Sequence, residues 1–149
     1  MEAESLKSKL MRYGFNYYPP FRASGAWLTY IGPDVRRVRL KLPLRSKTRN
    51  YVGTLCGGNM YSAVDGVYMV MLIKNLGSEY IVWDKSARIR YKKPSRETLY
   101  ADFHLSEQEL TTIKARVDEQ GKVEREYLIQ LRNAARCFHE ADFPAEAAF

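Results

Sequence analysis

An apolar segment with a single carboxylate constrains the fold of this chain more than any other feature. Residues 60–73 read Met-Tyr-Ser-Ala-Val-Asp-Gly-Val-Tyr-Met-Val-Met-Leu-Ile, and Asp65 is the one charged residue among them. A helix that is apolar on every face is a buried helix. A carboxylate inside it is costly unless it is paired, hydrogen-bonded or used in chemistry. The segment therefore predicts a central buried helix that carries a functional carboxylate.

A glycine-rich stretch leads into this helix. Residues 50–59 read Asn-Tyr-Val-Gly-Thr-Leu-Cys-Gly-Gly-Asn, and glycines allow a tight loop and a close approach of the backbone to a ligand. The first N–H groups of a helix have no partner within it, and they favour negative charge. We therefore expect Gly57 and Gly58 at a helix N-terminus that faces a ligand, with Asp65 two turns further on.

The segments around this helix alternate between apolar and polar residues, as strands of an antiparallel sheet do. Strands are predicted over residues 26–31, 37–44, 80–91, 99–105, 113–117 and 123–131. A short amphipathic helix over 5–11 that ends at Gly14, an extended connector over 17–21, a single capped turn at 106–109 and a tight turn at Gly121 complete the prediction. Only a sheet that wraps around the central helix would cover all of its faces.

We therefore expect an α+β chain of the hot-dog type, in which an antiparallel sheet wraps around one central buried helix. The 149 residues are expected to form a single domain. Its core spans about 26–132, a helical extension covers 1–25, and the tail from 136 onward has no assigned structure.

Composition and charge limit the possible partners. The formal charge of +7 favours an anionic partner. The basic residues form two clusters, 36–41 and 88–93, and each is either a solvated strand face or an anion site. No signal peptide and no membrane span are expected, because the apolar run is shorter than the roughly 20 residues that a bilayer requires. Cys56 and Cys137 show neither a pairing pattern nor metal-type spacing, which favours the cytoplasm.

The spacing from Asn50 to Asp65 resembles a known motif. Asn-x-x-Gly-x-x-Cys-Gly-Gly followed by Asp is similar to the Asn-x-x-Gly-x-x-His-Gly-Gly…Asp motif of the phenylacetyl-CoA thioesterase branch of the hot-dog acyl-CoA thioesterases. The basic turn 90–94, Arg-Tyr-Lys-Lys-Pro, resembles the turn that ends the strand after the helix in that group. The resemblance covers about residues 26–132. Cys56 replaces the family's histidine, as a non-histidine residue does in an uncharacterised branch with an N-terminal helical extension.

The resemblance implies roles for the motif residues. Asp65 would act on the thioester as general base or nucleophile, and Asn50 would position the water or the substrate. The backbone N–H groups near Gly57 and Gly58 would polarise the carbonyl, in agreement with the physics of a helix N-terminus. In that group each active site lies between two subunits, so a homodimer or homotetramer is implied. No cofactor is implied beyond the CoA of the substrate, and no metal.

Each of these assignments has a structural alternative. Asp65 could be hydrogen-bonded to a neighbouring subunit, and Asn50 could fix a loop turn. Cys56 could be a nucleophile activated by the helix N-terminus. It reads better as apolar filler beside the substrate, because the two histidines, His104 and His139, are poorly placed to serve as its base.

The remaining site residues are expected to contact CoA or the acyl group. Arg90, Lys92 and Lys93 would bind CoA phosphates, or they would be solvated strand residues. Tyr61 and Tyr68 would line the acyl pocket, or they would be core, as would Met69 and Met71.

Two other functions remain open. The first is a non-catalytic acyl-CoA or fatty-acyl binding protein on the same fold, favoured by the missing histidine. The second is a nucleic-acid binder, favoured by the charge alone, since no recognition helix, zinc site or aromatic sheet signature accompanies it. We therefore expect a small-molecule acyl-CoA partner, and neither nucleic acid nor a membrane.

Overall fold

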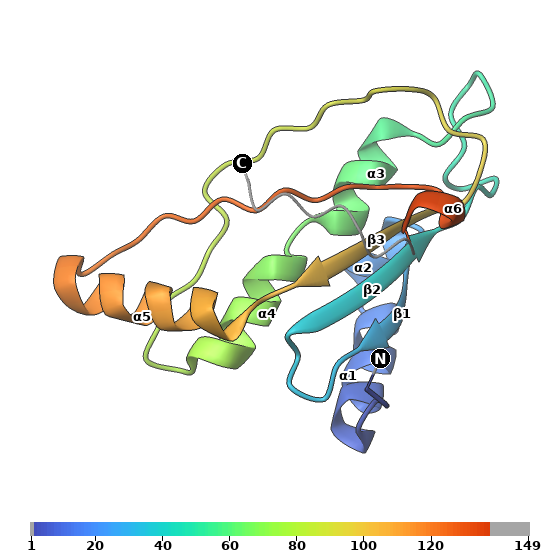
Figure 1. The fold of residues 1–149 in the computed structure, drawn as a ribbon. Helices are drawn as coiled ribbons and strands as arrows, with labels where there is room; N and C mark the ends of the chain where they lie inside the picture. The colour runs from blue at the N-terminus through green and yellow to red at the C-terminus, as the bar shows by residue number, and fades with distance from the viewer. Residues whose placement is uncertain (1, 138–149) are drawn as a thin grey trace.

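The computed structural model describes residues 2–137, which form helices together with one small sheet (Figure 1). The elements in chain order are α1 (Leu6–Tyr17), α2 (Pro19–Ala23), β1 (Trp27–Ile31), β2 (Arg37–Leu42), α3 (Gly57–Val64), α4 (Val67–Leu76), β3 (Leu99–His104), α5 (Glu107–Gln120) and α6 (Ala134–Cys137). The strands pair antiparallel in the order β1-β2-β3. The predicted combination of helices with an antiparallel sheet is therefore confirmed.

One face of the sheet forms the core. The β2–β3 register places Val38 opposite Phe103, Leu40 opposite Ala101 and Leu42 opposite Leu99, and all six side chains are buried. Buried residues of α3 and α4 belong to the same cluster, namely Met60, Ala63, Val67, Met71, Leu72 and Leu76. The strands predicted over 26–31, 37–44 and 99–105 are thus confirmed within one or two residues, because their period-two pattern matches a sheet with one buried face.

The opposite face of the sheet is charged. Asp102 accepts hydrogen bonds from the guanidinium groups of Arg37, at 2.9 Å, and Arg39, at 2.8 Å, and its side chain is only 6% exposed. Arg39 lies directly opposite Asp102 in the β2–β3 register. The first basic cluster is therefore part of the sheet's own surface, as the solvated-face interpretation predicts for these two arginines.

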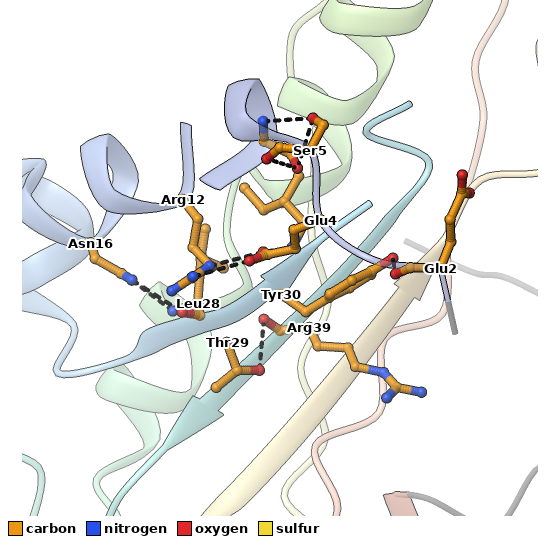
Figure 2. A network of polar contacts seen from close by, with 11 residues as sticks. Glu2, Glu4, Ser5, Arg12, Asn16, Leu28, Thr29, Tyr30 and Arg39 are labelled. Atoms are coloured by element: carbon orange, nitrogen blue, oxygen red, sulfur yellow. Dashed lines mark hydrogen bonds and ion pairs between the residues drawn. The ribbon is translucent and has the colours of Figure 1, made fainter. Parts of the chain in front are cut away.

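Side chains from the N-terminal segment close the free edge of β1 (Figure 2). The Asn16 amide donates to the Leu28 carbonyl at 3.0 Å and accepts from the Leu28 N–H at 2.7 Å. Glu4, which also binds Arg12, accepts from the Ile31 N–H at 2.8 Å. These bonds satisfy edge groups that would otherwise be open to pairing with another strand. Helix α1, which carries Asn16, extends to Tyr17. The predicted helix end at Gly14 is therefore wrong.

The predicted single central helix is also wrong, because two helices replace it. Asp65 is the C-cap of α3, with extended dihedral angles (φ −60°, ψ 134°). Gly66 adopts a left-handed conformation (φ 71°) and precedes α4. A residue with a side chain rarely takes that conformation, so the Asp-Gly pair allows the chain to stop and start a helix again. Asp65 is consequently exposed at a helix junction and does not lie within a buried helix.

The strand predicted over 113–117 is replaced by α5. The Ser106 hydroxyl accepts from the Glu109 N–H at 3.1 Å and caps a helix of 14 residues, which ends at Gly121 (φ 73°). The capping box was therefore the correct signal, but it opens a whole helix instead of one turn. The positive φ of Gly121 is as predicted, although it ends a helix and does not join two strands. Ile113 is the buried residue of this helix.

Residues 80–91 and 123–131 were predicted as strands, and neither is assigned to the sheet. In this part of the chain, Tyr100 and Arg132 exchange two backbone hydrogen bonds, which join the second segment to β3 at one point. Lys85 and Glu124 form an ion pair between the two segments. Figure 1 shows both as extended chain that is separate from the sheet over most of its length. The described residues of a single chain therefore do not complete a sheet around α3 and α4.

Residues 19–23 also differ from prediction, since the expected extended connector contains the short helix α2. Pro19 occupies its first turn, where a missing N–H has no cost. The unassigned tail lies outside the described residues, apart from α6.

Candidate functional site

An open cavity of about 2610 Å³ lies between the α3–α4 pair and the two extended segments. Its helical wall is mostly apolar and includes Met60, Val64, Tyr68, Met69 and Leu72. Its other wall carries the second basic cluster, Arg88, Arg90, Lys92 and Lys93, whose side chains are exposed. An apolar wall facing a cationic one can hold an amphiphilic anion, because each part of such a ligand finds its own surface.

Two carboxylates belong to this cavity. Asp65 lines it from the α3–α4 junction, and Asp84 lines it from the extended segment. Burial raises the pKa of Asp84, and the charge of Asp65 raises it further. The two groups therefore lie close enough to interact electrostatically, and a proton in this region is more readily held by Asp84 than by an isolated aspartate.

The N-terminus of α3 has free backbone donors. Cys56 is the N-cap residue with extended dihedral angles, and no side-chain hydrogen bond caps the helix there. The N–H groups of Gly57 and Gly58 in the first turn thus have no partner within the helix. They carry the positive end of the helix dipole, which stabilises a developing negative charge.

An aromatic ring lies against this helix end. A Cβ atom at Gly57 would be 2.7 Å from both Cζ and the hydroxyl oxygen of Tyr91, so the ring would have to move if residue 57 carried a side chain. Tyr91 also lines the cavity. It therefore connects the N-terminus of α3 to the cavity.

Asn50 organises the loop before α3. Its side-chain oxygen accepts from the N–H groups of Val52, at 3.1 Å, and Thr54, at 2.9 Å. Its amide nitrogen donates to the Thr54 hydroxyl at 2.8 Å. The loop itself thus uses both ends of this amide, which fits the loop-fixing alternative.

A stacked pair of tyrosines joins the helical wall to an extended segment, with Tyr68 on α4 and Tyr127 on segment 123–131. The rings of Tyr68 and Tyr127 lie 4.2 Å apart with an interplanar angle of 14°. The Tyr127 hydroxyl donates to Glu109 at 2.9 Å, and Arg125 binds the same carboxylate through two hydrogen bonds. Burial and the Glu109 charge raise the pKa of Tyr127 far above its ordinary value, so this phenol stays neutral.

The structure brings together most of the predicted contact residues. Asp65, Tyr61, Tyr68, Arg90, Lys92 and Lys93 all line the cavity. Asn50, Cys56, Gly57 and Gly58 are not among its lining residues, and they form the loop and helix end next to Tyr91. Of the methionines, Met69 lines the cavity whereas Met71 is fully buried core.

Sequence reasoning missed Asp84, Tyr91 and Tyr127 as members of this region. All three lie on segments that were predicted as regular strands, and alternation there gives no sign of which residue meets a helix end. His104 is exposed on the outer strand face, as predicted. His139 and the tail beyond Cys137 lie outside the described residues.

Among the described residues, no group of three or more His, Cys, Asp or Glu side chains could hold a metal ion. In residues 2–137, every helix is too short or too polar to cross a bilayer.

Comparisons with known proteins support the fold. A protein of unknown function from Pseudomonas aeruginosa, described as a probable thioesterase, aligns with a TM-score of 0.72 at 20% identity, with 85% of each chain covered. A protein of unknown function from Chlorobaculum tepidum aligns with a TM-score of 0.65 at 20% identity, covering 91% of this chain and 85% of its own. The comparison with curated proteins gives no match. A family model described as "Domain of unknown function (DUF4442)" matches residues 7–135, so the chain belongs to this family.

Proposed function

We propose that the protein hydrolyses acyl-CoA thioesters on a hot-dog type scaffold related to the phenylacetyl-CoA thioesterase branch. The observation that carries this proposal is the arrangement of α3, which has uncapped glycine N–H groups at one end and a cavity-lining Asp65 at the other. The similarity in fold to a probable thioesterase of Pseudomonas aeruginosa supports the same reaction class.

The chemistry follows from these groups. Asp65 accepts a proton from water while the water oxygen bonds to the thioester carbonyl carbon. The carbonyl oxygen becomes an oxyanion, which the N–H groups of Gly57 and Gly58 stabilise. The oxyanion then re-forms the carbonyl as the C–S bond breaks, and CoA leaves as a thiolate that takes the proton held by Asp65. The products are a carboxylic acid and free CoA.

The two ends of α3 are too far apart to serve one carbonyl within one chain. At about 1.5 Å rise per residue, Gly58 and Asp65 are separated by about 10 Å along the helix. A general base and an oxyanion site must both lie within about 3 Å of the reacting group. We therefore propose a symmetric dimer, in which Asp65 of one copy faces the α3 N-terminus of the other.

The ligand contacts divide between the two walls of the cavity. Lys92, Lys93 and Arg90 would hold the CoA phosphates by charge. Tyr61 and Tyr68 would line the acyl chain. Asn50 would fix the loop that sets the position of α3, in keeping with its hydrogen bonds to that loop.

A hydrolysis screen over acyl-CoA chain lengths and aryl-acetyl groups, measured by release of free thiol, tests the activity. We expect at least one substrate to be turned over by the wild-type protein and not by Asp65→Asn. If wild-type protein binds acyl-CoA in a titration but releases no thiol from any substrate, the alternative of a non-catalytic acyl-CoA binding protein replaces this proposal.

Mixing two inactive variants tests the shared site. Gly58→Pro removes the N–H of the second helical residue, while Gly58→Ala keeps it and fits the open space, since the nearest atom is Cys56 Sγ at 4.0 Å. Refolded mixtures of Asp65→Asn and Gly58→Pro chains should regain about a quarter of wild-type activity, because one site in each hybrid dimer carries neither change. No recovery in a verified hybrid would show that both groups act within one chain.

A further inference from the structure

The outer face of α1 carries an apolar stripe that no other described residue covers. Leu6, Leu10, Tyr13 and Tyr17 follow each other at helical spacing, and their exposed fractions are 76%, 64%, 53% and 60%. Residues at these intervals share one side of a helix. Figure 1 shows α1 at the periphery of the molecule, beside β1. The stripe is therefore presented to the surroundings along the whole helix.

The inner face of α1 is mixed, since Met11 and Phe15 pack against the core beside buried polar side chains. Ser8 and Asn16 are each 1% exposed, and Arg12 is bound to Glu4 on the side of the sheet edge (Figure 2). A surface helix ordinarily turns its apolar side inward and its polar side outward. α1 follows this order only in part, because it also presents the apolar stripe outward, and the hydrogen bonds between Asn16 and Leu28 fix that orientation. The exposed stripe is thus a stable feature of the fold.

Aromatic residues extend the stripe beyond the helix. The Trp27 ring meets the Tyr17 ring edge to face at 6.1 Å, and Tyr18 beside it is 55% exposed. The Arg22 guanidinium lies 5.8 Å from the centre of the Tyr17 ring. Tyrosine and tryptophan with leucine are the side chains that favour the boundary between lipid headgroups and acyl chains.

The charged side chains of the segment that carries the stripe have one sign. Lys7 and Lys9 flank it on α1, and both are exposed. Between Glu4 and Asp34 the sequence contains no acidic residue. A basic margin around an apolar strip complements a surface that is anionic outside and apolar beneath.

We propose that α1 docks the protein on an anionic membrane surface. Leu6 and Leu10 enter the headgroup boundary, the aromatic residues lie at its level, and the two lysines bind acidic headgroups. The helix lies in the plane of the surface and does not cross it. This surface is separate from the cavity, so the inference does not depend on the proposed hydrolysis. It replaces the sequence-based expectation of no membrane partner, because periodicity does not tell which face of α1 is turned outward.

A second copy of the chain is a poorer occupant of this surface. Two such helices paired face to face would bring the lysines that flank one stripe close to those that flank the other, and like charges across an interface oppose association. Docking on an anionic surface brings no like charges together, so this repulsion is absent.

Vesicle flotation of the full chain tests the proposal. We expect binding to phosphatidylcholine vesicles that contain phosphatidylserine, weaker binding at high salt, and little binding to phosphatidylcholine alone. The double change Leu6→Gln and Leu10→Gln should weaken binding at least tenfold without lowering the melting temperature. Val52→Gln is the matched control, because Val52 is an equally exposed apolar residue (67%) outside α1.

The fluorescence of Trp27 gives a second measurement of vesicle binding. Changing the other tryptophan, Trp83, to phenylalanine leaves Trp27 as the single reporter, and its emission should shift to the blue on addition of phosphatidylserine vesicles. The proposal is overturned if wild-type protein does not float with these vesicles, or if the double variant floats equally well. It is also overturned if the double change instead converts a dimer to a monomer, which would assign the stripe to a second copy.

Discussion

The hydrogen bonds between Asn16 and the edge of β1 make a sharp prediction about stability. Asn16 is 1% exposed and replaces a neighbouring strand for Leu28, since it both donates to and accepts from that residue's backbone. Asn16→Ala leaves a buried N–H and a buried carbonyl without these partners. Each such loss costs about 1–3 kcal/mol, so the two together should lower the free energy of unfolding by about 2–6 kcal/mol. The melting temperature should fall by about 4–24 °C.

Thr29→Ala is the matched control on the same strand. The Thr29 hydroxyl donates to the Arg39 carbonyl at 3.3 Å in an exposed position, so its loss should change stability by less than about 0.5 kcal/mol. Urea unfolding at equilibrium, followed by circular dichroism, measures both variants. If Asn16→Ala unfolds at the same urea concentration as Thr29→Ala, the edge-closing role of Asn16 is refuted.

A second substitution at position 16 should make the stability of the protein depend on pH. Asn16→Asp keeps the acceptor for the Leu28 N–H but directs a carboxylate at the Leu28 carbonyl. Burial would raise the pKa of this aspartate in the folded state, so the variant should lose stability as pH rises above the ordinary aspartate range and regain it in acid. Equal destabilisation of Asp and Ala variants at all pH values would contradict this account.

Three further outcomes are expected. Gly57→Ala should lower hydrolysis, because its Cβ displaces the Tyr91 ring from the α3 N-terminus. Adding Tyr91→Ala should relieve the clash but should not restore hydrolysis, since the ring is then absent. Unchanged hydrolysis in Gly57→Ala would show that Tyr91 is not part of the site. Changing Lys92 and Lys93 to alanine should weaken CoA binding and flatten its salt dependence in a titration, and an unchanged affinity at low salt would exclude them. Burial opposes ionisation of Glu109, but hydrogen bonds from its arginine and tyrosine neighbours lower its pKa below the usual 4.5. Its contribution to stability should therefore be lost as pH falls below 4.5 and through the lowered pKa, and Glu109→Gln should flatten this decline in unfolding free energy. An unaltered decline would contradict the assignment.

Local patterns predicted the sheet well. The alternation over 37–44 gave both the strand and its buried face, since Val38, Leu40 and Leu42 are buried as period two requires. The glycines at 57 and 58 gave the start of α3 correctly. These features depend on neighbours within a few residues, and sequence periodicity reports such local constraints directly.

The errors arose where a segment fits both the strand period and the helix period, or where tertiary contacts determine the local structure. Ile113, Ala115 and Val117 alternate, but Leu110, Ile113 and Val117 are also helically spaced, and the Ser106 cap decides for the helix. In the same way, the spacing on α1 gave a helix but not its orientation. That orientation depends on a side chain, Asn16, that pairs with a strand edge distant in sequence.

The candidate site was predicted in part for the same reason. The motif placed Asp65 and the two glycines on one helix, but the Asp-Gly junction moved the carboxylate out of the interior. Asp84 and Tyr91 meet this region through long-range contacts, and no local pattern indicates such contacts.

Hydrolysis by Asp65→Asn tests the central claim most directly. The variant keeps the shape of the side chain but removes its charge and basicity, and general-base assistance is worth about 10²- to 10⁴-fold. Glu119→Gln, an exposed change on α5 outside the cavity lining, is the matched control for loss of one negative charge. With the best substrate from the screen, we predict that Asp65→Asn lowers kcat by about 10²-fold or more. Its melting temperature and its affinity for a non-hydrolysable acyl-CoA thioether should equal those of the wild-type protein. The control variant should match the wild-type protein in all three measurements. A folded Asp65→Asn protein that hydrolyses the thioester at the wild-type rate would contradict the account.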